Sequence, residues 1–213
     1  MAILRGHSRL GSHTLRKMSL LCLLPGKGSV FGRMLIMMFI SLSIPVGSGS
    51  IVIANPPASP EYLIKAAYLY NFTKFVEWPP EAFEDDFSPI NLFILGADPF
   101  GEALDSIKNR TVQGRRLNIK YVNHIEEVSG CHILFISASE KENLRSILRI
   151  LKNSTILTIS ETENFSKRGG IINFIQVENK IHFEINPDAA QQGKLKISSQ
   201  LLRLAKIVSS ESR

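Results

Sequence analysis

Three short, mainly apolar segments constrain the fold of this chain most strongly. They are residues 90–95, 133–136 and 155–159, and each has the length and composition of a strand that is buried on both faces. Between them lie segments with helical spacing, of which residues 144–151 are the clearest. Strands that alternate with helices in this way predict a parallel sheet with helices packed against it.

The last third of the chain has a different pattern. From residue 171 apolar and polar residues alternate, and two such strands, 171–177 and 181–185, are joined at Glu178-Asn179 as in a hairpin. A stripe that includes Ile197 and Leu201 then predicts a terminal amphipathic helix that reaches Val208. The expected fold class is α/β, a single-domain sandwich with a mostly parallel sheet, an antiparallel edge hairpin and helices on both faces.

A first helix is expected from Glu61 to the Pro79-Pro80 pair. Apolar residues recur there at steps of three and four, which predicts one buried stripe, and a second apolar set covers much of the rest. The stripe is Ile64, Ala67, Tyr68, Phe72, Phe75 and Val76, and the second set is Leu63, Ala66, Leu69 and Tyr70. Trp78, the only tryptophan, lies beside two prolines and is a candidate for a contact surface.

The positive charge of the chain is concentrated near its start. The 213 residues include 25 Lys and Arg and 19 Asp and Glu, a net charge of +6, but six of the basic residues and none of the acidic ones precede residue 55. The remainder is neutral, so it lacks the charge expected of a nucleic-acid-binding protein. Positive charge that ends at Arg33, an apolar run over 34–44 and small residues up to Ala54 are typical of a signal peptide.

We interpret residues 1–54 as a leader that is cleaved near Ala54, residues 55–60 as a proline-rich tether and residues 61–209 as the folded domain. The basic region is long for a signal peptide, which leaves Met18 or Met34 as alternative translation starts.

An uncleaved membrane anchor is the competing interpretation of the leader. No charge occurs between Arg33 and Glu61, and about 20 apolar residues suffice to cross a bilayer. Pro45 and the glycines and serines after it make this span a poor one. Export with cleavage is therefore favoured over anchoring.

Export permits disulfides, but the expected mature domain contains only Cys131. This thiol lies in the apolar run 131–136, which predicts a packed thiol rather than a reactive one. The adjacent His132 points to the opposite face of the same strand, which argues against a Cys–His nucleophilic pair.

Signatures of catalysis are absent from the sequence. There is no phosphate-binding loop with a Gly-Lys-Ser/Thr end, no serine nucleophile elbow and no His-Glu-x-x-His helix. The mature domain keeps only His124, His132 and His182, and none of them has the spacing of metal ligands. We expect a protein that is not an enzyme and needs neither metal nor cofactor.

Two polar groups are candidates for binding. On the last strand of the hairpin Lys180, His182 and Glu184 share one face, which is either solvated surface or a small-anion site. Arg115 follows a glycine turn, where an arginine suits contacts with anions or proteins. The candidate small-ligand residues are Lys180, His182 and Arg115, and the candidate partner-binding residues are Trp78, Glu77 and Arg115.

Seven blocks along the chain resemble the YfiR family of small exported bacterial proteins. Each block alone is weak, but seven in the same order are specific, and the resemblance runs from about Glu61 to Val208. The blocks are residues 62–79, 94–101, 112–115, 131–136, 169–170, 183–186 and 195–202.

The resemblance implies a periplasmic regulator of a Gram-negative bacterium rather than a catalyst. Members of the family restrain an inner-membrane diguanylate cyclase by contacting its periplasmic region, and an outer-membrane lipoprotein can sequester the regulator. Lower cyclic di-GMP then disfavours biofilm formation. The resemblance also implies a homodimer, whereas the disulfides of better-known members have no counterpart in a domain with one cysteine. The alternative is a periplasmic module that binds a small anion for a signalling or uptake system.

Overall fold

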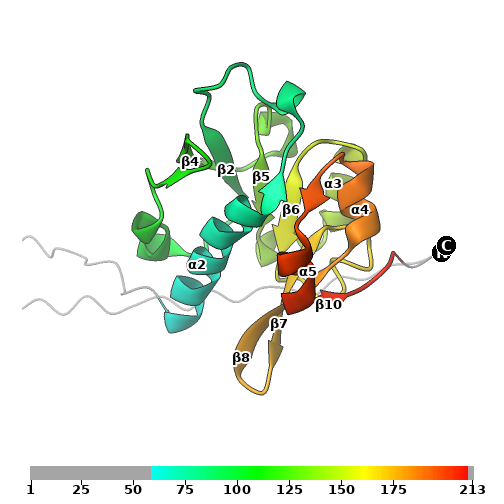
Figure 1. The fold of residues 1–213 in the computed structure, drawn as a ribbon. Coiled ribbons are helices and arrows are strands. Elements are labelled where there is room, and N and C mark those ends of the chain that lie inside the picture. The colour runs from blue at the N-terminus through cyan, green and yellow to red at the C-terminus, as the bar shows by residue number, and fades with distance from the viewer. Residues whose placement is uncertain (1–58, 211–213) are drawn as a thin grey trace, which may run out of the picture. The chain divides into compact units, whose positions relative to one another are not determined.

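The computed structural model describes residues 59–210, which fold around an eight-stranded mixed sheet (Figure 1). The strand order is β10-β8-β7-β6-β5-β2-β4-β3, and neighbours are parallel except in the pairs β7–β8 and β3–β4. The expected leader, its cleavage point and most of the tether lie outside the described residues.

The sheet strands follow the apolar segments of the sequence. They are β2 (Ile90–Leu95), β3 (Thr111–Val112), β4 (Arg115–Val122), β5 (Ile133–Ile136), β6 (Leu157–Ser160), β7 (Ile172–Val177), β8 (Lys180–Ile185) and β10 (Lys206–Ile207). A separate antiparallel pair joins β1 (Val76–Glu77) to β9 (Lys196–Ile197). The four α-helices of the described part are α2 (Pro60–Phe75), α3 (Leu144–Ile150), α4 (Pro187–Gln192) and α5 (Ser199–Leu204). Short 3-10 helices, η1 (Pro80–Ala82), η2 (Gly101–Ser106), η3 (Ile125–Glu127) and η4 (Ala138–Glu140), occupy loops.

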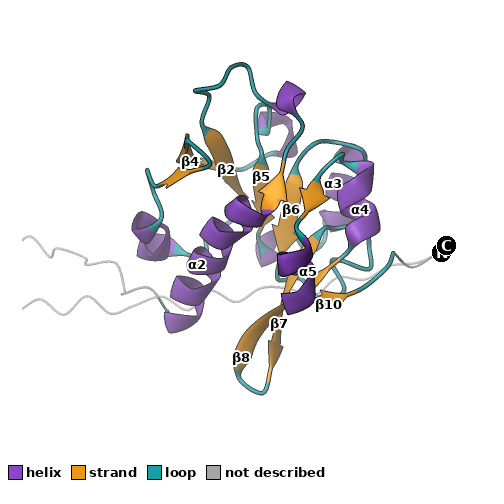
Figure 2. Cartoon of the chain, in the orientation of Figure 1, coloured by secondary structure: helices purple, strands orange, loops and turns teal. Residues whose placement is uncertain are grey.

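Helices cover both faces of the sheet (Figure 2). One core cluster holds Leu69 of α2 and Leu201 of α5, and the other holds Leu144 of α3. Along β2, Leu92 belongs to the first cluster and Phe93 to the second, as strand alternation requires. The expected α/β class is therefore confirmed, including the antiparallel β7–β8 hairpin. The two-residue strand β10 pairs with β8 and forms the edge of the sheet on that side.

The buried side of α2 agrees only in part with the stripe that we expected, of which Phe72 and Val76 are fully buried. Ile64 and Ala67 are exposed, and the buried residues are Lys65, Ala66, Leu69, Phe72 and Thr73. Both apolar sets have helical spacing, so the periodicity alone does not distinguish one rotation of the helix from the other.

Lys65 is the unexpected member of this buried side. Its side chain is 5% exposed, and its ammonium group lies 2.5 Å from carboxylate oxygens of both Glu61 and Glu161. The hydroxyl of Tyr62 also donates a hydrogen bond to Glu161, at 3.1 Å. Burial raises the pKa of Tyr62, and the charge of Glu161 adds to this effect. These contacts tie α2 to the loop that follows β6.

The expected terminal helix is also corrected. The segment forms the strand β9, the six-residue helix α5 and the strand β10 in succession. Ser198 accepts a hydrogen bond from the Leu201 N–H and so caps α5, while β9 and β10 pair with β1 and β8. Backbone pairing with strands distant in the sequence therefore overrides the helical spacing of this segment.

Candidate functional site

Trp78 is part of the core, which corrects the expectation that it lies at the edge of a contact surface. Its side chain is 9% exposed, and Nε1 donates a hydrogen bond of 3.2 Å to the carbonyl oxygen of His132. The cause is strand alternation: Val76 is buried, Glu77 is exposed and Trp78 is buried again. Glu77, the second candidate residue, therefore remains on the surface.

His132 is buried beside Trp78 and is held by two backbone groups. Nδ1 accepts a hydrogen bond of 3.1 Å from the Asn91 N–H, and Nε2 lies 3.0 Å from the Ala82 carbonyl oxygen. These partners fit a neutral ring with its proton on Nε2. Burial lowers the pKa of His132, and the charge of Arg115 acts in the same direction.

Two further side chains extend this arrangement to the surface. The ring of Phe83 stacks on that of His132 with centroids 4.5 Å apart, and the guanidinium carbon of Arg115 lies 3.8 Å from the Phe83 centroid. We call Trp78, His132, Phe83 and Arg115 the aromatic stack. The stack links Trp78 and Arg115, two of the candidate partner-binding residues, through His132 and Phe83.

Arg115 reaches this position from a tight turn. Gln113 and Gly114 have φ values of 51° and 79°, and Val112 pairs with Arg115, which confirms the expected glycine turn. The Gln113 amide donates to the carbonyl oxygen of Thr73 at 3.1 Å and so fixes the turn against the end of α2.

The stack holds the loop 83–88 in a defined shape. Arg115 Nη1 donates hydrogen bonds to the carbonyl oxygens of Asp85, at 2.7 Å, and Ser88, at 2.8 Å. The Asp85 carboxylate accepts from the Ser88 hydroxyl and the Phe87 N–H, and these bonds hold the pKa of Asp85 below its usual range. The ring of Phe87 has no place in this network and is 90% exposed.

Our reading of the sequence missed Phe87. A signal was present, because this phenylalanine directly follows Glu84, Asp85 and Asp86 and lies outside every apolar stripe. A large exposed ring on a loop that is itself held in place is a candidate for a contact with another protein.

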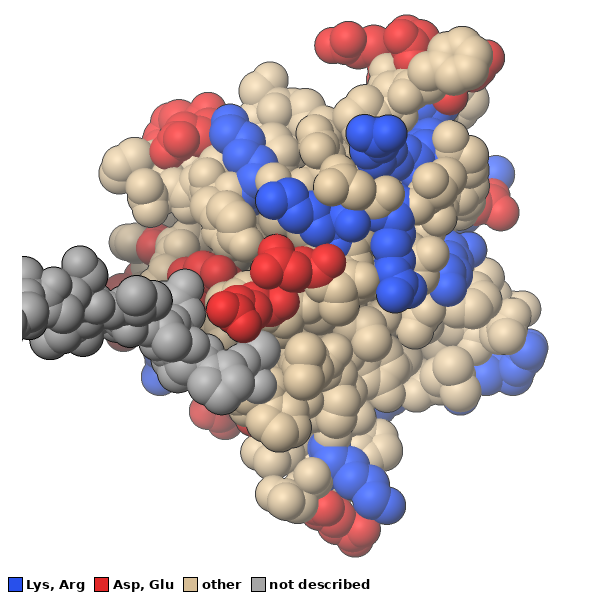
Figure 3. Space-filling view, turned by 90° about the vertical axis from the view of Figure 1, so that its left-hand side faces the viewer, with Lys and Arg blue, Asp and Glu red and all other residues tan. Residues whose placement is uncertain are grey.

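The charges beside this loop have both signs. Figure 3 shows the side of the molecule that carries β4, with acidic side chains gathered at the top and a band of Lys and Arg below them. Exposed basic residues on β4 and in the segment before it include Lys108, Arg110, Arg116 and Lys120. This side offers a partner an exposed ring, carboxylates and cations within one surface.

The candidate small-ligand residues are not brought together. Lys180 and His182 are exposed on β8, whereas Arg115 begins β4, and four strands lie between β8 and β4 in the sheet. At the usual strand spacing this separation is about 24 Å. A single small anion therefore does not contact all three residues.

Glu184 shares the strand face of Lys180 and His182 but is buried in a structural role. Lys206 donates to one carboxylate oxygen at 2.9 Å, and the Ser166 hydroxyl donates to the other at 2.8 Å. Burial alone would raise the pKa of Glu184, but these hydrogen bonds outweigh it and the pKa is lowered.

Between residues 59 and 210 no three His, Cys, Asp or Glu side chains are grouped so as to hold a metal ion. The same range contains no helix that is both long and apolar enough to span a membrane.

The structure defines an α/β domain in which Arg115 holds the surface loop 83–88 in place. The sequence matches the model of a family described as YfiR/HmsC-like over residues 62–206, and the protein belongs to that family. Proteins of this family are periplasmic regulators, not enzymes, and are linked to diguanylate cyclase signalling. No curated protein matches the sequence.

Proposed function

We propose that this protein is a periplasmic regulator that represses an inner-membrane diguanylate cyclase by binding its periplasmic region, and so lowers cyclic di-GMP and biofilm formation. The match to the YfiR/HmsC-like family over residues 62–206 carries this proposal. A regulator outside the cytoplasm acts on the messenger only through a membrane partner, by binding one state of that partner more tightly than the other.

The loop 83–88 is the docking element in this proposal. Phe87 is a large ring that is already exposed, and Arg115 orders the backbone on both sides of it, so little conformational entropy is lost on binding. Aromatic residues of this kind contribute a large share of binding energy at protein interfaces. Trp78 supports the loop from below through His132 and Phe83.

Two further contacts belong to the proposal. We expect a homodimer, for which the exposed Leu63 and Ile64 of α2, at 47% and 49%, supply apolar surface. We also expect an outer-membrane lipoprotein to compete with the cyclase for the protein. Light scattering of the Leu63→Ser/Ile64→Ser variant tests the dimer, which this change should weaken.

The decisive experiment is deletion of the gene, followed by complementation. Cyclic di-GMP should rise in the deletion strain and fall again with the wild-type gene, but not with Phe87→Ser. Val177→Ser is the matched control, because Val177 is also an exposed apolar residue but lies at the tip of the β7–β8 hairpin. Co-purification of the cyclase with each variant from membranes should follow the same order.

Two results would contradict the proposal at different levels. If the level of cyclic di-GMP is unchanged in a clean deletion strain that expresses the cyclases, a cyclase is not the target of this protein. If Phe87→Ser complements fully, the protein can still be a regulator, but the loop 83–88 is not its docking element.

A further inference from the structure

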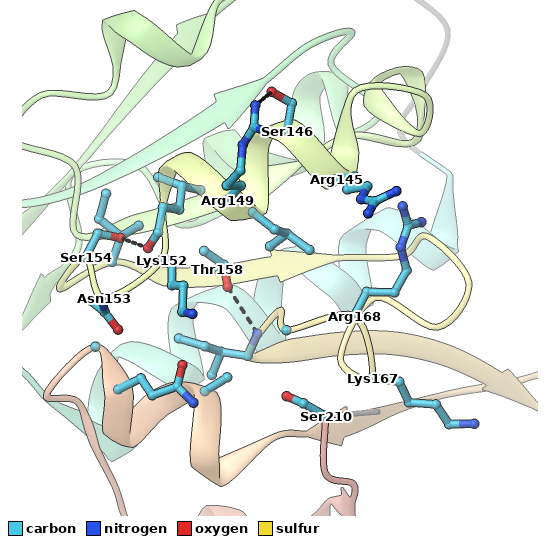
Figure 4. Close-up of a pocket in the computed structure, with 18 residues that line it drawn as sticks. Arg145, Ser146, Arg149, Lys152, Asn153, Ser154, Thr158, Lys167, Arg168 and Ser210 are labelled. Carbon is cyan, nitrogen blue, oxygen red and sulfur yellow. Dashed lines mark hydrogen bonds between the residues drawn. The ribbon is translucent and has the colours of Figure 1, made fainter. Parts of the chain in front are cut away.

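A groove of about 730 Å³ lies away from the aromatic stack, between α3, the turn at residues 167–169 and the end of α4 (Figure 4). This volume is within the usual range for sites that bind small molecules. Its inner surface includes Leu148, Ile156, Ile171 and Ala189. The groove thus has an apolar floor that suits the hydrocarbon or aromatic part of a ligand.

The charges that line the groove all have the same sign. Five lining residues are basic, and no Asp or Glu is among the lining residues. They are Arg145, Arg149, Lys152, Lys167 and Arg168. They come from α3, the segment after it and the 167–169 turn. The positive charge of the groove therefore arises because the fold brings two separate parts of the chain together.

Two neutral polar side chains of the groove, Thr158 and Ser154, already have partners within the protein. Thr158 Oγ1 accepts a hydrogen bond from the Ile171 N–H at 3.1 Å, and the Ser154 hydroxyl donates to the Leu151 carbonyl oxygen at 2.7 Å. Arg145 and Arg168 are both exposed and are therefore the groups best suited to a charged ligand.

The two arginines at one end of the groove face each other. In Figure 4 the guanidinium groups of Arg145 and Arg168 point toward one another from opposite walls. Neither forms a salt bridge with any residue between 59 and 210. Facing cations without a counter-ion repel each other, and an anion between them removes this repulsion.

We propose that this groove binds an organic phosphate, with the phosphate between Arg145 and Arg168 and its apolar substituent on the Leu148 and Ile171 floor. Guanidinium groups contact phosphate oxygens through two parallel N–H bonds, so two of them satisfy a dianion from both sides. The chemistry is shared by soluble phosphate esters and by phospholipid head groups, and the test distinguishes these sources. The proposal does not depend on the cyclase as partner.

The test is calorimetric titration of the purified protein with 1-naphthyl phosphate, alongside sedimentation with vesicles of phosphatidylglycerol or phosphatidylcholine. Saturable binding of naphthyl phosphate supports a soluble ligand, and selective sedimentation with phosphatidylglycerol supports a lipid head group. In either case Arg145→Gln/Arg168→Gln should weaken binding about tenfold or more, because hydrogen bonds to a charged group are lost. Arg203→Gln on α5 is the matched control, since Arg203 is also an exposed helical arginine outside the groove, and it should bind like the wild type.

A second measurement keeps the test independent of folding. Circular dichroism should show that the double variant is folded, and in low salt without ligand its melting temperature should equal or exceed that of the wild type, because the repulsion is removed. If the double variant is unfolded, the single variants Arg145→Gln and Arg168→Gln replace it, and each should weaken binding in the same direction. Absence of binding to both the phosphate and the vesicles, or equal weakening by Arg203→Gln, would overturn the proposal.

Discussion

The indole N–H of Trp78 donates a hydrogen bond of 3.2 Å to the carbonyl oxygen of His132, a residue 54 positions further along the chain. The bond joins the segment after α2 to the start of β5, and both side chains are buried. His132 in turn is the base on which Phe83 and Arg115 stack. The tryptophan therefore acts from within the core, through the order it gives to the loop 83–88.

Replacement of Trp78 by Ala should destabilise the protein by about 3–5 kcal/mol, because a large cavity forms and the His132 carbonyl oxygen loses its partner. Urea unfolding followed by circular dichroism measures the change. Phe87→Ala is the control, since its ring is almost fully exposed, and it should alter stability by less than about 0.5 kcal/mol. Equal stability of the two variants would contradict the buried position of Trp78.

The lowered pKa of His132 predicts a loss of stability in mild acid. The folded ring resists protonation, whereas the unfolded ring takes up a proton near its ordinary pKa of about 6.5. The free energy of unfolding should therefore hold above about pH 6.5 and fall as the pH decreases below it. His132→Gln should be less stable at neutral pH but should lose less on going to about pH 5. An unchanged pH profile in this variant, compared with the exposed-site control His182→Gln, would disagree with this account.

Cys131 should be inert in the folded protein. The thiol is buried, and burial raises its pKa to about 12, so almost no thiolate is present at neutral pH. A colorimetric thiol reagent should react with it only after denaturant is added, while the melting temperature should be insensitive to reductant. Cys131→Ser should cost about 1–2 kcal/mol through weaker packing. Rapid reaction without denaturant would show that the thiol is accessible.

Glu184 should make the free energy of unfolding depend on pH in a second, more acidic range. Its lowered pKa means that its contribution is present above the unfolded value of about 4.3 and is lost as the pH falls through the folded value. Glu184→Gln should reduce stability at pH 7 by about 1–3 kcal/mol, since the bonds to Lys206 and Ser166 are weakened. The difference from wild type should shrink toward about pH 3. Glu178→Gln, in the exposed hairpin turn, should show no such trend.

Arg115→Ala should release the loop 83–88 without unfolding the domain. The variant loses two hydrogen bonds to loop carbonyl groups and the contact with Phe83. Hydrogen exchange measured by mass spectrometry should become faster in residues 83–88 and stay unchanged in β5. Arg116→Ala is the control, because Arg116 is the exposed neighbour on β4. Slow exchange of the loop in Arg115→Ala would show that other contacts hold it.

The order of the long buried strands could be predicted because such strands leave apolar runs in the sequence. Three features could not. The position of Trp78 depends on β1 pairing with β9, about 120 residues away in the chain, and no local pattern records that pairing. The separation of Arg115 from His182 depends on strand order, which the spacing of residues does not specify. The cationic groove is formed by α3 and the 167–169 turn, and each of these is an ordinary charged surface in the sequence.

The contacts of Lys65 decide how α2 is rotated about its own axis. The buried side of the helix takes Ala66 and Leu69 from one apolar set and Phe72 from the other, so the apolar pattern alone does not specify the rotation. In the observed rotation the Lys65 ammonium group and the Tyr62 hydroxyl both reach the Glu161 carboxylate. The ion pair between Lys65 and Glu161 therefore favours this orientation of the helix. In the same orientation Leu63 and Ile64 lie on the exposed side of the helix.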